Sequence, residues 1–214
     1  MATFTRADLT LALVAVVRIL GIDPGTQVVG YGCLEVSFES ARAQGATAPL
    51  AMRGSNVVRV GSSVAGDVRV VAAGVLRLGG RIPVPDRLLS LANQYRELMQ
   101  RVGPAELAIE EAFYGKSVQA ALRIGEARGV VLAESARAGL SVFQFAPARV
   151  KRCVTGNGAA AKEVVAAMML RLLQAAPGWL AMEPADATDA LAVAWTRLEQ
   201  RRSPLLNVAD DGGK

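Results

Sequence analysis

The chain has 214 residues, a length typical of a single domain with a sizeable core, and 52% of them are apolar, which indicates a globular protein. It contains no histidine, so the sequence excludes Ser–His and Cys–His catalytic pairs and leaves acid, base and metal chemistry to Asp, Glu, Lys and Tyr. The net charge is +5, and a positive excess favours a polyanionic partner.

Near its start the chain has a short apolar run, Leu9–Val17, which we interpret as neither a membrane span nor a signal peptide. The run is far below the roughly 20 apolar residues that cross a bilayer, and Arg18 interrupts it. No small-residue cleavage site follows before Asp23. We therefore expect a cytoplasmic protein that engages no membrane, with residues 1–16 as an extension outside the core.

Three strands are predicted in the first part of the chain. Arg18–Asp23 and Val28–Phe38 are rich in apolar and β-branched residues, and a Pro-Gly turn separates them. Residues 39–66 are mostly small and polar, with a short β-prone piece at Asn56–Val60, and are predicted to form an inserted loop or hairpin extension. Asp67–Leu78 alternates well enough to be a third strand, so the three make an antiparallel meander.

From Asp86 onward the apolar spacing changes to a helical period, and helices then alternate with short strands. The predicted elements are a helix at Asp86–Val102, a strand at Glu106–Glu111, a helix at Ser117–Arg137, a strand at Ser141–Phe145, and helices at Pro147–Val154, Ala160–Gln174 and Pro184–Arg202. This order predicts an α/β fold in one domain, residues 17–202, with helices on both faces of a mixed five-stranded sheet. The tail, residues 203–214, is expected to be disordered.

Basic residues are concentrated in one stretch of the chain. Between Ala112 and Lys162, eight Lys and Arg residues are opposed by only two Glu residues, a local net charge of +6. Such a concentration is typical of a surface that binds a polyanion, although a solvated helix surface would give the same pattern. The two cysteines, Cys33 and Cys153, are too few for a structural zinc site and suit a reducing cytosol, so we interpret them as small buried apolar side chains.

Two of the predicted strands end on carboxylates. Asp23 follows a buried strand, where an α/β sheet presents side chains to a crevice, although an Asp beside Pro-Gly often serves only its own turn. Glu110 and Glu111 close the strand that begins at Glu106. Side-chain alternation directs them to opposite faces of the sheet, and the residues alone do not decide which one faces a site.

A second pair of acids opens the last predicted helix. Asp186 and Asp189 are three residues apart, so they share one face of that helix, and most of their neighbours are Ala or Leu. A pair that points to water is the alternative, but acids embedded in an apolar helix favour a bound cation. Together with the strand-end acids they suit Mg²⁺ or Mn²⁺, and two such ions would support phosphodiester hydrolysis.

Four short motifs resemble the RuvC family of Holliday-junction resolvases. They follow the order expected of the family and lie at Gly21–Gly25, Ala108–Phe113, Gly125–Val130 and Ala185–Ala192. The similarity runs from about Arg18 to Arg197 and covers most of the chain. It implies an RNase H-like fold and a homodimer that makes paired, Mg²⁺-dependent nicks across four-way DNA junctions, during homologous recombination and DNA repair.

The resemblance also implies roles for individual acids. Asp23 matches the first metal-binding acid of the family, and Glu110, rather than Glu111, takes its central acidic position. Asp186 and Asp189 match the two acids of the last helix, where some relatives carry histidine in place of the first. The four are thereby expected to be catalytic and to hold magnesium.

Residues for DNA binding are implied in the same way. The lysines that flank the Gly-rich turn of the family fall on Lys151 and Lys162, where they would contact or neutralise the scissile phosphate. Phe113 matches an aromatic residue thought to stack on a junction base, with a position in the core as the alternative. Lys116 and Arg149, from the basic stretch, complete the predicted DNA-binding set.

The resemblance further suggests RuvA and RuvB as partners in branch migration, and the helix at 117–137 as a contributor to subunit pairing. It leaves residues 1–16 without a counterpart. Val17 falls where the initiator Met of the family stands, so we suggest that an upstream start was wrongly assigned. Peptides from Ala2–Val14 in mass spectra of the native protein would contradict this suggestion.

Three other functions share parts of this pattern. A sugar-kinase or actin-like ATPase also opens with Gly-Ile-Asp-x-Gly, but it needs a second phosphate loop and a second lobe, for which 214 residues leave little room. A non-catalytic nucleic-acid-binding module would account for the basic stretch and leave the acids unexplained. An RNase H-like nuclease with another substrate, such as an RNA–DNA hybrid, stays open because fold alone does not fix the substrate.

Overall fold

The computed structural model describes residues 15–38, 59–63, 66–79, 82–111, 117–174 and 184–203. The strands in these ranges are β1 (Ala15–Pro24), β2 (Val28–Phe38), β3 (Arg59–Ser63), β4 (Gly66–Arg77), β5 (Glu106–Glu110) and β6 (Ser141–Phe145). The helices are α1 (Val84–Val102), α2 (Val118–Arg137), α3 (Pro147–Thr155), α4 (Lys162–Leu172) and α6 (Ala185–Arg202). None of these described helices is long and apolar enough to cross a membrane.

The strands form one mixed sheet in the order β3-β4-β2-β1-β5-β6. β1 pairs antiparallel with β2, and β2 with β4, which is the predicted meander. β5 is parallel to both β1 and β6. The predicted mixed sheet of five strands is therefore confirmed. β3 adds a short sixth strand at the edge, paired with β4, from within the segment 39–66 that we predicted as an inserted loop or hairpin.

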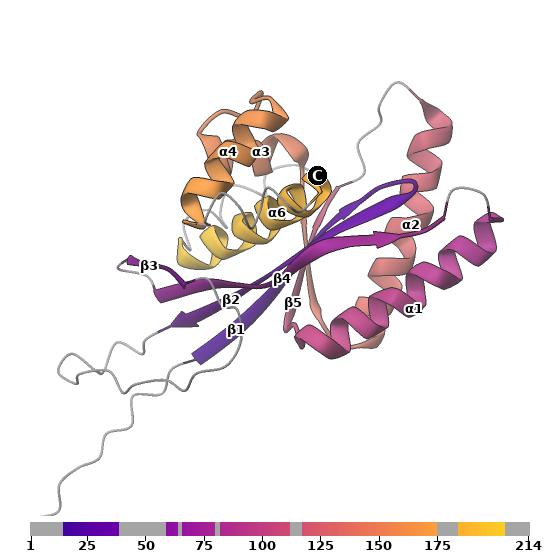
Figure 1. Cartoon of the computed structure of the whole chain (residues 1–214), viewed down its shortest axis with the longest axis horizontal. Helices are drawn as coiled ribbons and strands as arrows, with labels where there is room; N and C mark the ends of the chain where they lie inside the picture. Colours follow the sequence, from indigo (N-terminus) through magenta and orange to yellow (C-terminus); the bar gives the residue numbers. More distant parts are fainter. Residues whose placement is uncertain are drawn as a thin grey trace, which may run out of the picture.

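Helices cover both faces of the sheet (Figure 1), as the sequence predicts. Alternation along the strands divides the core between the two faces. Ile19 and Ala108 pack with α3, α4 and α6, whereas Leu20 and Leu107 pack with α1 and α2. All four side chains are fully buried, so β1 and β5 form the centre of the molecule. The ends of these two strands consequently have fixed positions relative to the helices on either side.

The ends of some elements differ from the prediction by a few residues. β1 begins at Ala15, three residues before the predicted start, because its pairing with β2 continues to that point. α6 begins at Ala185, with Pro184 as its N-cap rather than its first helical residue. The predicted extension was residues 1–16, and its last two residues, 15 and 16, instead belong to β1. The rest of that extension, most of the segment 39–66 and the tail from residue 204 lie outside the described residues.

Both cysteines are free thiols. Cys33 is fully buried in the sheet, and burial raises the pKa of its thiol to about 12. Cys153 is half-buried beside Thr196, and burial also raises its pKa. Thiols in this condition are unreactive, which agrees with their interpretation as small apolar side chains.

Candidate active site

Asp23 and Glu110 are neighbours at the carboxyl ends of two adjacent parallel strands. Asp23 is the penultimate residue of β1, and Glu110 is the last residue of β5. Ile22 stands opposite Ile109 in the pairing of these strands, so the acid that follows each of them lies at the same level. Side chains at this end of a parallel sheet face a crevice. Glu110 is half-buried there, whereas Glu111 is exposed.

Two glycines allow α6 to bring its own acids onto these strand ends. A methyl group at Gly30 of β2 would collide with the carbonyl oxygen of Asp186, and one at Gly21 of β1 would collide with that of Ala190. Because neither position carries a side chain, the first turns of α6 pack directly on the backbone of the sheet. This close approach places Asp189 in one pocket with the acids of β1 and β5.

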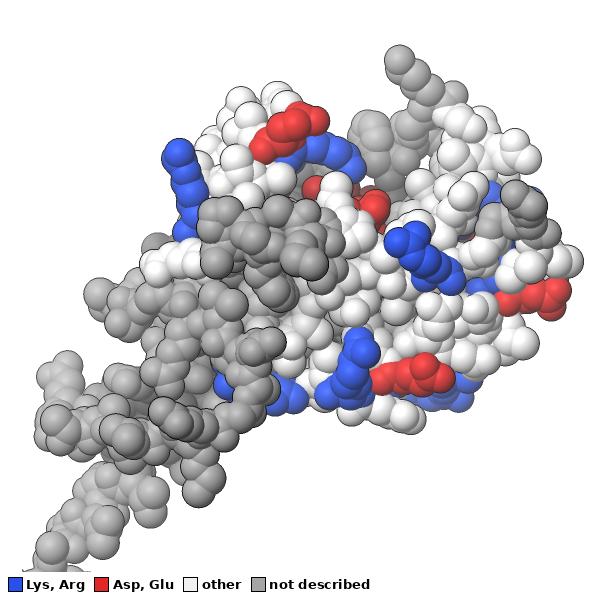
Figure 2. Space-filling model, viewed as in Figure 1, with Lys and Arg blue, Asp and Glu red and all other residues white. Residues whose placement is uncertain are grey.

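One small cavity of about 120 Å³, which we call the acidic pocket, is lined by Asp23, Glu110 and Asp189. Two lysines complete its polar lining, Lys162 from the start of α4 and Lys151 from α3. The Lys162 Nζ donates a hydrogen bond of 2.9 Å to Asp189 Oδ2, which is also an ion pair. The remaining wall is apolar and consists of Pro147, Val150, Val165 and Ala192. Figure 2 shows Asp and Glu atoms within a hollow of the surface, with Lys and Arg atoms beside it.

Burial and mutual repulsion raise the pKa values of the strand-end acids. The pKa of Asp23 rises from 3.8 to about 6, chiefly through burial and then through the charges of Asp189 and Asp186, while Lys162 opposes the rise. The pKa of Glu110 rises from 4.5 to about 7, again through burial first and then through the charges of Asp23 and Asp189. A cation in the pocket would stabilise the ionised form of both acids.

The donor set of the pocket fits a hard divalent cation. Carboxylate oxygens are the ligands that Mg²⁺ and Mn²⁺ prefer, and three carboxylates line the cavity while a fourth, Asp186, acts on Asp23 through its charge. Among the described residues, no three acids lie close enough together, in their present side-chain conformations, to coordinate one metal ion. Lys162 supplies positive charge instead, and its hydrogen bond to Asp189 raises the pKa of the ammonium.

The structure separates the predicted site residues into those it brings together and those it does not. One pocket contains Asp23, Glu110, Asp189, Lys151 and Lys162. Asp186 is half-buried one turn earlier on α6 and does not line that pocket in the described part of the chain, although its charge reaches Asp23. Arg149 lines a different cavity. Phe113 and Lys116 lie outside the described residues.

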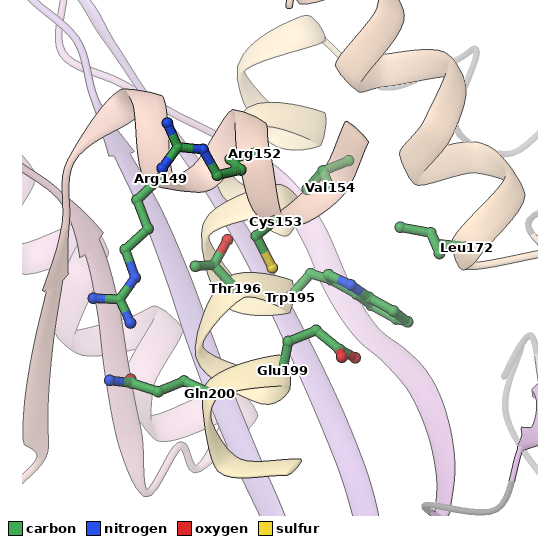
Figure 3. Close-up of a pocket in the computed structure, with 9 residues that line it drawn as sticks. All are labelled: Arg149, Arg152, Cys153, Val154, Leu172, Trp195, Thr196, Glu199 and Gln200. Atoms are coloured by element: carbon green, nitrogen blue, oxygen red, sulfur yellow. The ribbon is translucent and has the colours of Figure 1, made fainter. Parts of the chain in front are cut away.

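The cavity bordered by Arg149 lies between α3, α4 and the C-terminal half of α6 and has a volume of about 520 Å³ (Figure 3). Its lining includes the apolar side chains of Trp195 and Leu172. The guanidinium of Arg149 also stacks on Phe145, 5.2 Å from the centroid of the ring. Lys151 lines the acidic pocket, so α3 contributes residues to both cavities. Arg149 and Lys151, although two residues apart, line different cavities.

The apolar wall of the acidic pocket was not predicted as part of the site. Val150 and Val165 stand on α3 and α4 and line the cavity beside the acids. Each is followed four residues later by another buried side chain, Val154 and Met169, and this helical spacing was the only signal in the sequence that they face inward. Apolar side chains carry no chemical motif, so the spacing indicates burial and not a role at a site.

The mixed sheet with helices on both faces is an RNase H-like fold. Acids at two adjacent strand ends and on α6 are an arrangement typical of nucleases of this fold. A model of the family "Crossover junction endodeoxyribonuclease RuvC" matches residues 45–197. The RuvC of Anaeromyxobacter sp. (strain Fw109-5) is 39% identical over 87% of this chain and 75% of its own length. The RuvC of Gluconacetobacter diazotrophicus is 36% identical over 88% of this chain and 94% of its own. The chain belongs to the RuvC family and is a hydrolytic nuclease.

Solved structures agree with this assignment. The Thermus thermophilus RuvC structure has a TM-score of 0.65 and 28% identity, and the match covers 86% of this chain and 95% of that one. T. thermophilus RuvC in complex with a Holliday junction substrate has a TM-score of 0.66 and 27% identity, over 87% and 95% of the two chains. The yeast mitochondrial Holliday junction resolvase Ydc2 shares the fold, with a TM-score of 0.54 and 13% identity over 85% and 78%.

Proposed function

We propose that the acidic pocket is the active site at which this chain hydrolyses phosphodiester bonds of four-way DNA junctions. Membership of a family of crossover junction endodeoxyribonucleases supports the activity, and the related T. thermophilus protein has been seen in complex with a Holliday junction substrate. The observation that carries the proposal is the grouping of Asp23, Glu110 and Asp189 in one cavity, where burial and mutual repulsion raise the pKa values of the first two.

The carboxylates of Asp23, Glu110, Asp186 and Asp189 would hold Mg²⁺, with two ions as the expected number and Mn²⁺ as a substitute. When bound, such ions activate a water molecule and stabilise the charge on the leaving oxygen. The carboxylates themselves bind and orient, and the chain has no histidine that could take the place of a base. Asp186 lies outside the pocket lining given by the described residues, so we expect its contribution to be the smallest.

We infer that the two lysines of the pocket contact the scissile phosphate, because both line the cavity beside the acids. In the structure the Lys162 ammonium neutralises part of the acidic charge through Asp189. Once Asp189 is engaged by another cation, the same ammonium can face a phosphate oxygen, with Lys151 on the α3 side of the pocket.

α2 carries a surface suited to a second copy of the chain, which would supply the second nick. An uncharged stripe of exposed residues follows one side of the helix at helical spacing and consists of Val118, Leu122, Gly125, Gly129, Ala133 and Ala136. Leu122 is 63% exposed, and the space beside both glycines is open. Small side chains let two helices approach closely, so we propose that α2 packs against its counterpart in a homodimer.

Family membership and the motif resemblance also lead us to propose assembly with RuvA and RuvB and a cytoplasmic location. Co-purification of tagged protein with RuvA or RuvB from cells tests the first part. Recovery of the protein with the cytoplasmic fraction tests the second.

The function is tested by incubating the protein with a synthetic four-way junction, a linear duplex and an RNA–DNA hybrid, each with and without Mg²⁺. We expect symmetric nicks in the junction, and only when Mg²⁺ is present. Hydrolysis of ATP without cleavage of DNA would overturn the proposal. Preferential cleavage of the hybrid would assign the pocket to another substrate.

Glu110→Gln and Glu111→Gln are a matched pair of variants, because the two acids are adjacent and only Glu110 lines the pocket. Glu110→Gln should abolish nicking and leave binding of the junction intact, whereas Glu111→Gln should cut as the wild type does. An inactive Glu111→Gln beside an active Glu110→Gln would place the site on the other face of the sheet.

The dimer is tested by Leu122→Glu, with Leu89→Glu on α1 as the control, since Leu89 is 59% exposed and lies on a different helix. Sedimentation should show that Leu122→Glu is a monomer and that Leu89→Glu remains a dimer. The reverse result would move the subunit contact from α2 to α1.

A further inference from the structure

Arg128 connects α2 to the end of the strand that carries Glu110. Its Nε donates a hydrogen bond of 3.3 Å to the carbonyl oxygen of Glu110, and its Nη2 donates to the side-chain amide oxygen of Gln144 on β6. The other arginines of α2 behave differently. Arg123 is paired with Glu126 of the same helix, and Arg137 with Glu134. Arg128 is the arginine of α2 that reaches across to the sheet.

These contacts hold the Glu110–Glu111 peptide from both of its sides. The carbonyl group of Glu110 accepts from Arg128, and the amide N–H of Glu111 donates to the carbonyl oxygen of Phe145 at 2.9 Å. Glu110 is the last residue of β5, and the next described residue beyond Glu111 is Ser117. The direction in which the Glu110 carboxylate leaves the backbone therefore depends on how this one peptide is held.

We propose that Arg128 is a positioning residue for Glu110. It makes no hydrogen bond to the carboxylate in the described structure and does not line the acidic pocket. It acts on the backbone, where a charged donor with two neighbouring N–H groups on one edge of its guanidinium holds both the end of β5 and Gln144 of β6. The proposal rests on the function proposed above for the pocket, and it deepens that function by adding a residue from outside it.

The placement of Arg128 on α2 also links the site to the proposed subunit contact. Gly125 and Gly129, on either side of Arg128 in the sequence, belong to the uncharged stripe of that helix. A partner helix that packs on the stripe restricts the movement of α2, and Arg128 transmits that restriction to the backbone of Glu110. Subunit pairing would then improve the alignment of each active site in addition to supplying a second one.

The test compares Arg128→Met, which keeps the length of the side chain and removes its donors, with Arg128→Lys and with Arg123→Met. Arg123→Met removes the same charge from the same helix without touching the sheet. Three quantities are measured for each protein: the rate of single-turnover nicking of a saturating four-way junction in Mg²⁺, the Kd for the junction without Mg²⁺, and hydrogen exchange at the Glu111 amide.

For Arg128→Met we expect the nicking rate to fall about 100-fold, as a misplaced catalytic group does, with the Kd no weaker than that of Arg123→Met. Exchange at the Glu111 amide should become faster. Arg128→Lys keeps one charged donor and should recover about tenfold of the lost rate. If Arg128→Met does not fold, Gln144→Leu serves instead, because it removes the second acceptor of Arg128 and should slow nicking at unchanged Kd.

A nicking rate in Arg128→Met equal to that of Arg123→Met would overturn the proposal. So would a loss of rate matched by an equal loss of affinity, because that result assigns Arg128 to direct DNA contact. Failure of the proposed function looks different: the wild type would then not nick the junction, or Glu110→Gln would nick it as well as the wild type does.

Discussion

Glu106 and Glu110 begin and end the same strand, and alternation places them on the same face, yet their surroundings are opposite. Glu106 is buried and is bonded by two arginines of α6, Arg197 at 2.8 Å and Arg201. Glu110 is partly buried beside the other acids of the pocket, and burial first, then the charges of Asp23 and Asp189, raise its pKa. One strand thus carries a glutamate whose charge is fully compensated and another whose charge is not.

β1 repeats this contrast between its two ends. Near its start, Arg18 bonds the buried Glu35 at 2.8 Å, and Arg69 completes that cluster. At its other end, Asp23 lies in the acidic pocket with a raised pKa. A buried acid with its own arginines is compensated within the fold, and loss of one partner is costly, whereas a buried acid among other acids favours a cation from elsewhere. Compensation by arginines distinguishes Glu35 and Glu106 from Asp23 and Glu110, the acids that we propose as catalytic.

The largest expected effect of this difference is on catalysis, in the variant Asp23→Asn. Loss of one charged oxygen ligand removes several kcal/mol of transition-state stabilisation, so nicking of a four-way junction should fall by about 1,000-fold or more. The same change relieves repulsion in the pocket, so the melting temperature without Mg²⁺ should stay the same or rise. Calorimetry that showed a marked fall would place Asp23 with the compensated, structural acids.

Glu106→Gln is expected to show the opposite pattern. It leaves two arginines of α6 without their carboxylate, and only 12% of the Arg197 side chain is exposed, so water cannot replace the partner. Removal of one partner of a buried ion pair costs about 3 kcal/mol, or roughly 10 °C in melting temperature for a chain of this size. Nicking at 25 °C should be close to that of the wild type, because the folded fraction remains high.

The two kinds of acid should also differ in their dependence on pH. The pKa of Glu110 rises from 4.5 to about 7, so the folded state holds that proton more tightly than the unfolded state does. Stability is therefore greatest below pH 4.5 for this group and decreases as the pH rises to about 7, since the folded chain must then carry an unfavourable charge. Asp23 acts in the same direction over a window that ends at about pH 6.

Mg²⁺ should cancel this loss, because a bound cation stabilises the ionised acids. The increase in melting temperature on addition of Mg²⁺ is expected to be larger at pH 8 than at pH 5, and smaller in Glu110→Gln than in the wild type at pH 8. Glu106→Gln serves as the control and should keep the full Mg²⁺ response. A response to Mg²⁺ that is the same at both pH values would contradict the raised pKa values.

The positions of the candidate acids could be predicted from the sequence, because strand ends and helix spacing are local properties, whereas their lack of arginine partners could not. Asp23 is followed directly by Pro-Gly, which ends its strand, and an apolar run precedes Glu110. The spacing of Asp186 and Asp189 placed both on one face of α6. It could not show that only Asp189 lines the pocket, because depth along that face depends on Gly21 and Gly30 of the sheet.

Other parts of the site depend on long-range packing and could not be predicted. Arg149 and Lys151 are two residues apart in the same basic stretch, yet they line different cavities. Their separation follows from the packing of α3 against both α4 and α6, which no local pattern records. The contact of Arg128 with the backbone of Glu110 joins residues 18 positions apart and involves a carbonyl group that every residue possesses. The charge of the stretch therefore predicted binding of a polyanion, but it could not show which of its basic residues line the acidic pocket and which contact other parts of the fold.

The smallest expected effect concerns Lys162, whose ion pair with Asp189 partly compensates the pocket. The Lys162 side chain is 73% exposed, compared with 12% for Arg197 in the cluster around Glu106. An ion pair open to water contributes about 0.5 kcal/mol, so Lys162→Met should lower the melting temperature without Mg²⁺ by roughly 2 °C, and by nothing once Mg²⁺ is saturating. Lys151→Met, which removes a lysine of the same pocket, is the control.

This small effect is the most direct measure of how far the pocket acids are already neutralised. If Lys162→Met costs as much stability as Glu106→Gln, Asp189 is compensated as fully as the structural glutamates are, and the pocket has little need of a metal ion. If the cost is small and Mg²⁺ removes it, the lysine acts as a weak and replaceable cation. The negative charge of the pocket then remains available to the ion and, through it, to the phosphate of the DNA.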